Sequence, residues 1–291
     1  DHGDAYSPGW FDLPLGAGEM ATILLTAESE VPDVEAILTP PAPKLPKHAP
    51  DLSEDAFGAR LARAARAYLV RRDGGATVIA GYPWFLDWGR DTLIALRGLV
   101  VAGYHEETLD VLRTYGALER DGTLPNMLSA DSTANRETSD APLLYALACE
   151  DAARVLGESL YDEKASDGRT IGEILLSIAR GYAAGAPNGV RVDAESGLVW
   201  SPPHYTWMDT NYPAATPREG YPIELAALWI RLLRQLERRG ALGGDPHLVG
   251  LRAHAETSFS LYVRDDLPFL SDTLHAGPGT PARISTASCR R

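Results

Sequence analysis

The chain has 291 residues, of which 45% are hydrophobic and 23% are charged, proportions that are typical of globular proteins with a packed core. Its formal net charge of −13 argues against nucleic acid and anionic membrane surfaces as partners, because both are bound by a basic face. A neutral substrate is compatible with this charge.

Targeting and redox signals are few. The sequence has no run of about 18 apolar residues and begins with polar residues, so we expect neither a membrane span nor a signal peptide. A cytoplasmic location is the default expectation, although a fragment that lacks its true start would also lack a signal. Cys149 and Cys289 are the only cysteines, and they predict no disulfide framework.

The first fifth of the chain differs from the rest. Residues 1–30 combine turn signals at residues 7–9 and 16–18 with a β-type run over residues 20–26, which predicts the end of a β-sandwich domain. Most of that domain would precede Asp1, because two strands cannot bury a core. Residues 31–52 are rich in proline and predict a surface linker that cannot sustain a helix.

From Ser53, which is expected to cap the first helix, two helix types alternate along the chain. One type has a single apolar face, and the other is apolar nearly all round and therefore requires burial on all sides. The one-sided helices are predicted at residues 53–69, 106–118, 171–182 and 246–262, and the apolar ones at residues 92–102, 142–153 and 222–236.

This alternation predicts two concentric layers, an inner ring of helices wrapped by an outer ring, and hence an all-α toroid. A plain helical solenoid is the alternative. Long loops with aromatic and charged residues precede the apolar helices at residues 81–91, 122–140 and 197–221, whereas the loops that follow these helices are short. We therefore expect the functional residues at one rim, where the N-terminal ends of the inner helices point into a common funnel.

The first of these loops carries the strongest signal. Residues 80–91 contain four aromatic residues, two carboxylates and one guanidinium directly before an apolar helix. Aromatic rings stack on the C–H groups of sugars, and arginine and aspartate bind sugar hydroxyls in pairs. The alternative is a buried aromatic cluster in which Asp91 is an ordinary helix N-cap, but it leaves Arg90 and Asp87 unexplained.

Asp209 is the candidate general acid, because it lies between Trp207 and Tyr212, where partial desolvation favours a protonated carboxyl. An Asx-turn is the alternative. Glu224, in the first turn of an apolar helix, either compensates the helix dipole or points into the funnel. Asn126 and Asp140 in the second loop are also compatible with turn and cap roles. No His, Cys or carboxylate set has metal-binding spacing, so the sequence predicts neither a metal nor a cofactor.

Four ordered segments, at residues 81–92, 124–126, 206–209 and 216–229, resemble the amylo-α-1,6-glucosidase domain of glycogen debranching enzymes. The resemblance implies an (α/α)6 toroid related to glucoamylases, preceded in bacterial members by a β-sandwich. It also implies an inverting exo-hydrolase that releases glucose from the α-1,6 branch stubs of glycogen or limit dextrin.

The resemblance further implies roles for individual residues. Asp209 would be the general acid, while Arg90 and Asp91 would hold the terminal glucose. The expected sugar-binding set also contains Trp84, Asp87, Trp88, Asn126, Asp140, Trp207, Arg218 and Glu224.

The resemblance ends near Pro278, and residues 281–291 form an atypical tail. Inversion needs a second carboxylate about 6.5–9.5 Å from the acid, and the family's base lies late in the toroid, which places it beyond Arg291. Residues 53–280 contain about seven of the twelve helices that a complete toroid has, so the resemblance implies an incomplete domain with impaired activity. Two alternatives stay open, a trehalase-like or other glucoamylase-related exo-glycosidase and a noncatalytic carbohydrate-binding protein.

Overall fold

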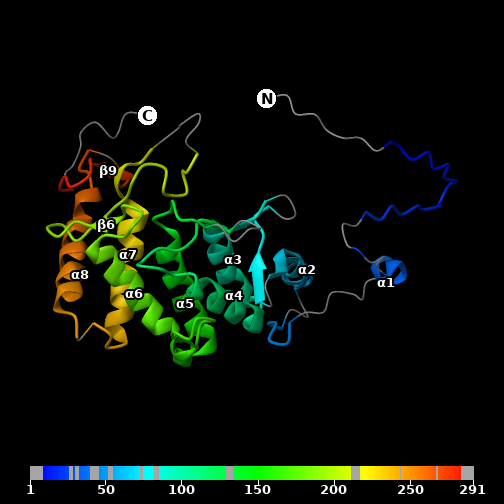
Figure 1. The fold of residues 1–291 in the computed structure, drawn as a ribbon, viewed down its shortest axis with the longest axis horizontal. Helices are drawn as coiled ribbons and strands as arrows, with labels where there is room; N and C mark the ends of the chain where they lie inside the picture. The colour runs from blue at the N-terminus through cyan, green and yellow to red at the C-terminus, as the bar shows by residue number, and fades with distance from the viewer. Residues whose placement is uncertain are drawn as a thin grey trace. The chain divides into compact units, whose positions relative to one another are not determined.

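The computed structural model describes residues 9–25, 29, 33–39, 46–51, 55–72, 75–81, 85–128, 134–210, 217–242, 244–266 and 268–282. The chain divides into two compact units, residues 1–43 and residues 44–291 (Figure 1).

The first unit contains little regular structure in its described part. Residues 9–25 are exposed and form neither helix nor strand, so the strand predicted over residues 20–26 is absent from its described portion, residues 20–25. A strand is stable only when a neighbour pairs with it, and no described segment does so. The prediction of a β-sandwich end is therefore still a prediction.

The proline-rich linker contains a helix that the sequence analysis excluded. The helix α1 spans Val34–Leu38, and the Asp33 side chain caps it by accepting a hydrogen bond of 3.1 Å from the Ala36 amide. The prediction failed because the prolines leave a proline-free run between Pro32 and Pro40, long enough for one turn and preceded by a favourable cap.

The second unit is built from helices, and within its described part seven α-helices follow the predicted order to within a few residues. They are α2 (Ala56–Ala65), α3 (Gly89–Val101), α4 (His105–Ala117), α5 (Ala141–Leu156), α6 (Ile171–Ala184), α7 (Ile223–Arg238) and α8 (Pro246–Ser258). Short 3-10 segments follow three of them, η1 (Arg66–Tyr68), η2 (Glu158–Asp162) and η3 (Phe259–Tyr262).

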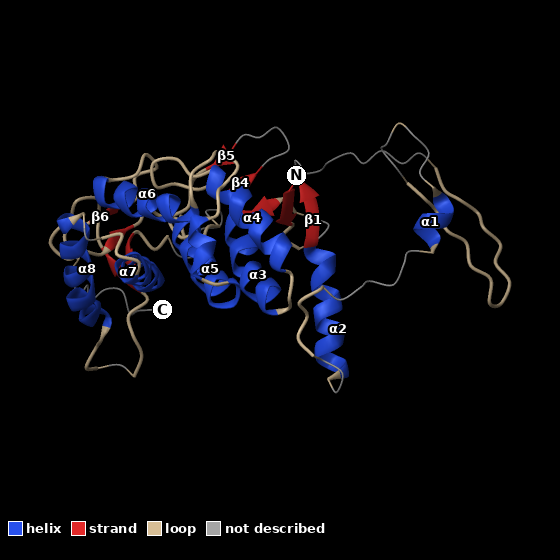
Figure 2. Ribbon diagram, turned by 90° about the horizontal axis from the view of Figure 1, so that it is seen from below, coloured by secondary structure: helices blue, strands red, loops and turns tan. Residues whose placement is uncertain are grey.

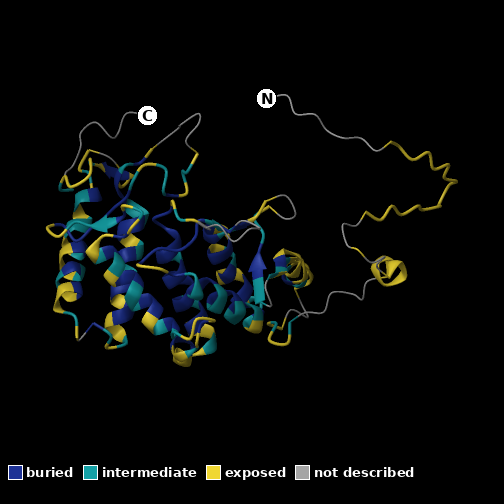
Figure 3. Ribbon diagram, viewed as in Figure 1, coloured by how far each residue is buried: buried dark blue, intermediate teal, exposed yellow. Residues whose placement is uncertain are grey.

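These helices form two layers. The helix α5 packs against α3 on one side and α7 on the other, while α4, α6 and α8 pack behind this row (Figure 2). Buried residues concentrate in α5, which lies in the middle of the row (Figure 3). The arrangement is compatible with an incomplete helical toroid whose inner helices are α3, α5 and α7.

The helix α3 departs from its prediction because one of its sides is open. Its Ile94 and Val101 side chains are 49% and 67% exposed, whereas Leu93 and Leu96 are buried. The row of inner helices continues from α3 only toward α5 in the described part of the chain, so the opposite face of α3 has no inner neighbour.

The beginning of the helical unit is also shorter than predicted. The helix α2 starts after Asp55, which accepts a hydrogen bond of 2.8 Å from the Gly58 amide, and the expected cap Ser53 lies outside the described residues. The expected apolar face is largely exposed, with Ala62 as its buried residue. At Leu69 the chain turns into an antiparallel hairpin of β1 (Leu69–Arg72) and β2 (Gly75–Val78), which packs on α4.

Short antiparallel strand pairs stiffen the loops that precede the inner helices, although the sequence predicts an all-α unit. They are β3 (Asp87–Trp88), β4 (Met127–Leu128) and β5 (Ala134–Asn135) in the order β3-β4-β5, β6 (Arg191–Val192) with β7 (Val199–Trp200), and β8 (Gly220–Pro222) with β9 (Thr273–His275).

Large buried side chains join these loops to the helices. Tyr182 of α6 stacks on Trp229 of α7 with ring centroids 6.0 Å apart. The Tyr182 hydroxyl donates to the Ser139 carbonyl at 2.9 Å, and the Trp229 indole donates to the Gly197 carbonyl at 3.0 Å. Each aromatic residue therefore buries apolar area and fixes one loop, because its polar atom is satisfied there.

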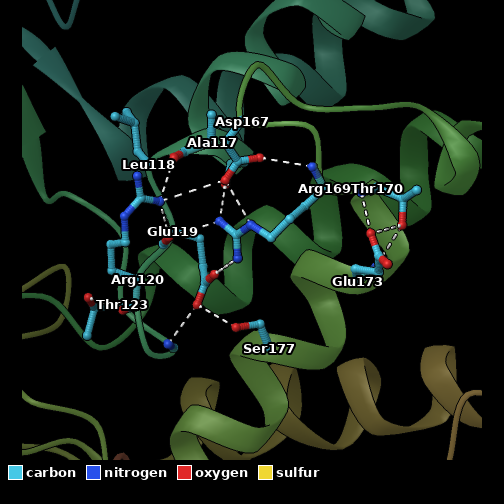
Figure 4. A network of polar contacts seen from close by, with 12 residues as sticks. Ala117, Leu118, Glu119, Arg120, Thr123, Asp167, Arg169, Thr170, Glu173 and Ser177 are labelled. Carbon is cyan, nitrogen blue, oxygen red and sulfur yellow. Dashed lines mark hydrogen bonds and ion pairs between the residues drawn. The ribbon is translucent and has the colours of Figure 1, made fainter.

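A network around the buried Glu119 connects the end of α4 to α6 (Figure 4). The Glu119 carboxylate accepts hydrogen bonds from the Gly122 amide at 2.7 Å and the Ser177 hydroxyl at 3.0 Å, and it pairs with Arg169. Arg169 also binds the more exposed Asp167 at 2.8 Å. The network fixes the first residues of the loop that leads to α5.

We expect Glu119→Gln to lower the free energy of unfolding by about 1.5–3 kcal/mol, because charged hydrogen bonds to a fully buried carboxylate are lost. The matched control is Asp167→Asn, which removes the other carboxylate from Arg169 at a partly exposed site and should cost less than about 1 kcal/mol. Urea unfolding of both variants measures the difference, and equal losses would contradict the structural role of Glu119.

Candidate functional site

The N-terminal ends of the inner helices meet at an arginine that is shared by two carboxylates. Arg90, in the first turn of α3, binds Asp140 through Nε at 2.5 Å and through Nη2 at 3.2 Å. Its Nη1 donates to Asp209 Oδ2 at 3.0 Å. These three residues come from α3, from the start of α5 and from the loop before α7, so the structure brings them together as predicted for one rim.

Burial and charge act in opposite directions on Arg90. Burial alone would lower the pKa of its guanidinium, but Asp140 and Asp209 outweigh this effect and raise that pKa, so Arg90 stays charged. Arg90 is 9% exposed and Asp140 is 3% exposed, whereas the Asp209 side chain is 30% exposed. Asp209 is therefore the member of this group that solvent or a ligand can reach most easily.

Asp140 occupies the N-cap position of α5 but does not cap the helix with its side chain. Its Oδ1 accepts a hydrogen bond of 2.7 Å from the hydroxyl of Thr138, which is fully buried, and both carboxylate oxygens bind Arg90. Instead of Asp140, the Thr138 hydroxyl accepts a hydrogen bond of 3.4 Å from the Ala141 amide. The Asp140 carboxylate therefore orients Arg90 and does not cap the helix.

A second arginine group lies at the start of α7. Arg218 pairs with Glu224 of the first turn and with Asp272, which precedes β9, and its Nη2 lies 2.7 Å from Glu224 Oε2 and 2.9 Å from Asp272 Oδ1. Arg218 also donates to the Thr206 hydroxyl at 3.0 Å, and its Cζ lies 6.0 Å from the ring centroid of Trp207.

The loop 206–209 joins the two arginine groups. Thr206 and Trp207 contact Arg218, while Asp209 binds Arg90. Trp207 is 57% exposed, so part of its ring is available for stacking on a sugar. The apolar setting expected for Asp209 is modified by this ion pair, and Tyr212 lies outside the described residues.

Among the described residues, the remaining candidates of the first loop form no ion pair with Arg90. Asp87 is buried and its Oδ2 lies 3.1 Å from Arg72 of β1, so it ties β3 to the hairpin. Trp88 pairs with Met127 and stands at the N-cap position of α3. Asp91 is exposed in the first turn of α3 and is not its N-cap, which contradicts the capping alternative. Trp84 lies outside the described residues.

Asn126 acts mainly through its backbone. Its carbonyl accepts from the Gly89 amide at 2.8 Å, and its amide donates to Asn135 at 2.6 Å. Its buried Oδ1 accepts no hydrogen bond from the described residues. This buried acceptor belongs to the residue whose carbonyl holds the first residue of α3.

Sequence reasoning missed Thr138, Thr206 and Asp272. Thr138 and Thr206 are single hydroxyls whose partners lie on other loops or in tight turns, and no spacing marks them. Asp272 lies 54 positions from Arg218 in the sequence, so only the pairing of β8 with β9 brings them together.

Within the described residues, no group of three or more His, Cys, Asp or Glu side chains is placed to hold a metal ion. None of the helices in this part of the chain has the length and apolar character that crossing a membrane requires.

The chain is similar to one family of known proteins. A family model described as amylo-alpha-1,6-glucosidase matches residues 63–253, which is more than half of the 291 residues. The matched range contains Arg90, Asp140, Asp209, Arg218 and Glu224, whereas Asp272 lies beyond it.

The close contact between α3 and the second loop gives a test of the site's geometry. A Cβ on Gly89 would lie 2.5 Å from the Pro125 carbonyl oxygen, whereas a Cβ on Gly98 of the same helix meets no atom within 4 Å. Gly89→Ala should lower the free energy of unfolding by about 1–3 kcal/mol through overpacking. The matched control Gly98→Ala should raise it by about 0.5–1 kcal/mol, as expected for an open helical site. Urea unfolding compares them, and two stabilised variants would show that residues 125–126 do not constrain Arg90.

Proposed function

The chain belongs to the amylo-alpha-1,6-glucosidase family, and we propose that it hydrolyses α-1,6-glucosidic branch stubs of glycogen or limit dextrin and releases glucose with inversion. The domain is of the glycoside hydrolase type. The observation that supports the proposal is the convergence of Arg90, Asp140 and Asp209 at the N-terminal ends of inner helices, inside the range that matches the family.

Asp209 is the proposed general acid, which donates a proton to the oxygen of the leaving glucan chain. It is the more exposed of the two carboxylates on Arg90, and it follows the half-exposed Trp207 in the same loop. A general acid has to reach the scissile oxygen and hold a proton. Asp209 is paired with Arg90, so we propose that the bound sugar replaces Asp209 as an Arg90 partner.

Arg90 is the proposed ligand of the terminal glucose. A guanidinium has five N–H donors, and the described residues accept from three of them on Arg90. The other two have no acceptor among the described residues, and we propose that they bind sugar hydroxyls together with the donor that Asp209 releases, with Asp91 as an exposed acceptor in the same helical turn. Trp207 supplies a ring surface for stacking, and the proposed substrate is a neutral branched α-glucan.

Glu224 is the proposed wall of the pocket and not the base. Inversion requires a second carboxylate that deprotonates water on the opposite face of the sugar. Both oxygens of Glu224 are bound by Arg218. Each oxygen therefore already accepts a hydrogen bond from the protein, so Glu224 belongs to the Arg218 group and is not a free base.

Asp209→Asn is the decisive variant, since it removes the proton donor and keeps the size of the side chain. In a chain that also carries the region of the general base, we expect glucose release from branched limit dextrin to fall by a factor of about 10³ or more, with little change in sugar affinity. Asp167→Asn, far from the rim in sequence and in its contacts, is the control and should keep the wild-type rate.

The same assay separates the alternatives. Release of β-glucose from limit dextrin but not from trehalose or linear maltooligosaccharides supports the debranching assignment, while trehalose cleavage would favour the other exo-glycosidases. Isomaltose binding by calorimetry without release of glucose would indicate a carbohydrate-binding protein. Wild-type turnover in Asp209→Asn would remove Asp209 from the mechanism.

A further inference from the structure

We propose that Arg218 is a positioning residue that anchors the loop 206–209 and does not bind the sugar itself. The inference rests on the proposed function only in assigning the acid to that loop, because the anchoring follows from contacts within the protein. Arg218 is 1% exposed, although arginine is among the residues that are least often buried completely.

All five N–H donors of Arg218 are occupied by protein acceptors. Nε donates to Asp272 Oδ2 at 2.9 Å, Nη1 donates to Thr206 Oγ1 at 3.0 Å and to Glu224 Oε1, and Nη2 donates to Glu224 Oε2 at 2.7 Å and to Asp272 Oδ1 at 2.9 Å. No donor is left for a sugar hydroxyl. This saturation distinguishes Arg218 from Arg90, which keeps two donors beyond its described partners.

Two of the contacts fix the loop that carries the proposed acid. The Thr206 hydroxyl accepts from Arg218 and also from the Met208 amide at 3.4 Å, which closes a small turn directly before Asp209. The guanidinium also lies 6.0 Å from the Trp207 ring centroid, at the distance of a cation–π contact. Arg218 therefore holds consecutive residues of the loop while Asp209 reaches across to Arg90.

The backbone of Arg218 supports the same role. Its φ of +54° lies in the left-handed region, which is unfavourable for a residue with a Cβ. Such a conformation persists only where the surrounding contacts determine it. Here the side chain is bound on three sides, by β9 through the adjacent Asp272, by α7 through Glu224 and by the loop through Thr206. These contacts fix both the backbone conformation of Arg218 and the direction of its side chain.

Lysine should not replace this arginine. The two carboxylates outweigh the effect of burial and raise the pKa of the Arg218 guanidinium, so the group is charged. An ammonium has three donors on one atom and cannot make the five hydrogen bonds and two bidentate pairs of Arg218. Arg218→Lys thus keeps the charge but loses the geometry, and Thr206→Val removes only the acceptor in the loop.

Hydrogen exchange of the peptide that covers residues 205–210 tests the anchoring in the full chain without requiring activity. Exchange should become about tenfold faster in Thr206→Val and in Arg218→Lys, because one stabilising hydrogen bond of the loop is lost. The control Thr108→Val removes an equally buried hydroxyl, which binds the Tyr104 carbonyl in α4, and should leave this peptide unchanged. Unchanged exchange in both test variants would overturn the inference.

Turnover on limit dextrin adds a second readout. For Thr206→Val we expect kcat to fall about tenfold with KM within about a factor of two, because a displaced acid slows the chemical step and leaves sugar binding intact. Thr206→Ser, which restores the hydroxyl, should recover both the exchange rate and kcat. A raised KM with unchanged kcat would overturn the inference and make this group a substrate ligand.

The two proposals fail separately. If Asp209→Asn keeps wild-type turnover, the assigned acid is wrong, yet faster exchange of residues 205–210 in the anchor variants still supports the role of Arg218. If Asp209→Asn is inactive while Thr206→Val and Arg218→Lys match the wild type in exchange and kcat, the assigned function stands and the anchor is refuted.

Discussion

The rim depends on one electrostatic constraint, which is that a buried guanidinium lies at the positive end of a helix. Arg90 is in the first turn of α3 and is 9% exposed. A cation there is opposed by the helix dipole, and a buried charge without partners costs several kcal/mol. The two carboxylates on Arg90 offset this cost only if α5 and the loop 206–209 are held at hydrogen-bond distance from α3. The contacts of Arg90 therefore fix the relative positions of three segments.

The short strands and close backbone contacts of the loops supply the rigidity that this constraint needs. The pairing of β3 with β4 and the hydrogen bond from Gly89 to Asn126 hold the second loop against α3. The pairing of β8 with β9 brings Asp272 to Arg218. A site built from loops becomes precise when such contacts lock each loop to a helix, because sugar binding and proton transfer tolerate only small displacements.

The helices could be predicted from the sequence because their signal is local. The spacing of apolar residues by three and four positions predicts α4 through α8 to within a few residues. This prediction requires no knowledge of tertiary contacts. The hairpin of β1 and β2 was missed because its first strand continues the apolar spacing of α2. Pairs such as β8 with β9 depend on residues more than 50 positions apart, and no local pattern records them.

The candidate site shows the same difference between what the sequence indicates locally and what only the folded structure decides. Arg90, Asp140 and Asp209 were nominated from composition and from the resemblance, and the structure joins them. Asp87 is also an aspartate and lies in the same loop as the sugar-binding candidates, but its carboxylate pairs with Arg72. The sequence shows which residues are able to bind a sugar, whereas the occupied hydrogen-bonding groups decide which of them are available.

The two arginines of the rim illustrate this point. Arg218 has no N–H left and both oxygens of Glu224 are taken, so this group is closed and acts as a scaffold. Arg90 keeps two donors beyond its described partners and is paired with a carboxylate whose side chain is 30% exposed, so this group is more open than that of Arg218. In the proposed mechanism, the sugar takes over the Nη1 donor that binds Asp209. Sugar binding and release of Asp209 would then be coupled through one guanidinium, while Arg218 would keep the loop in place.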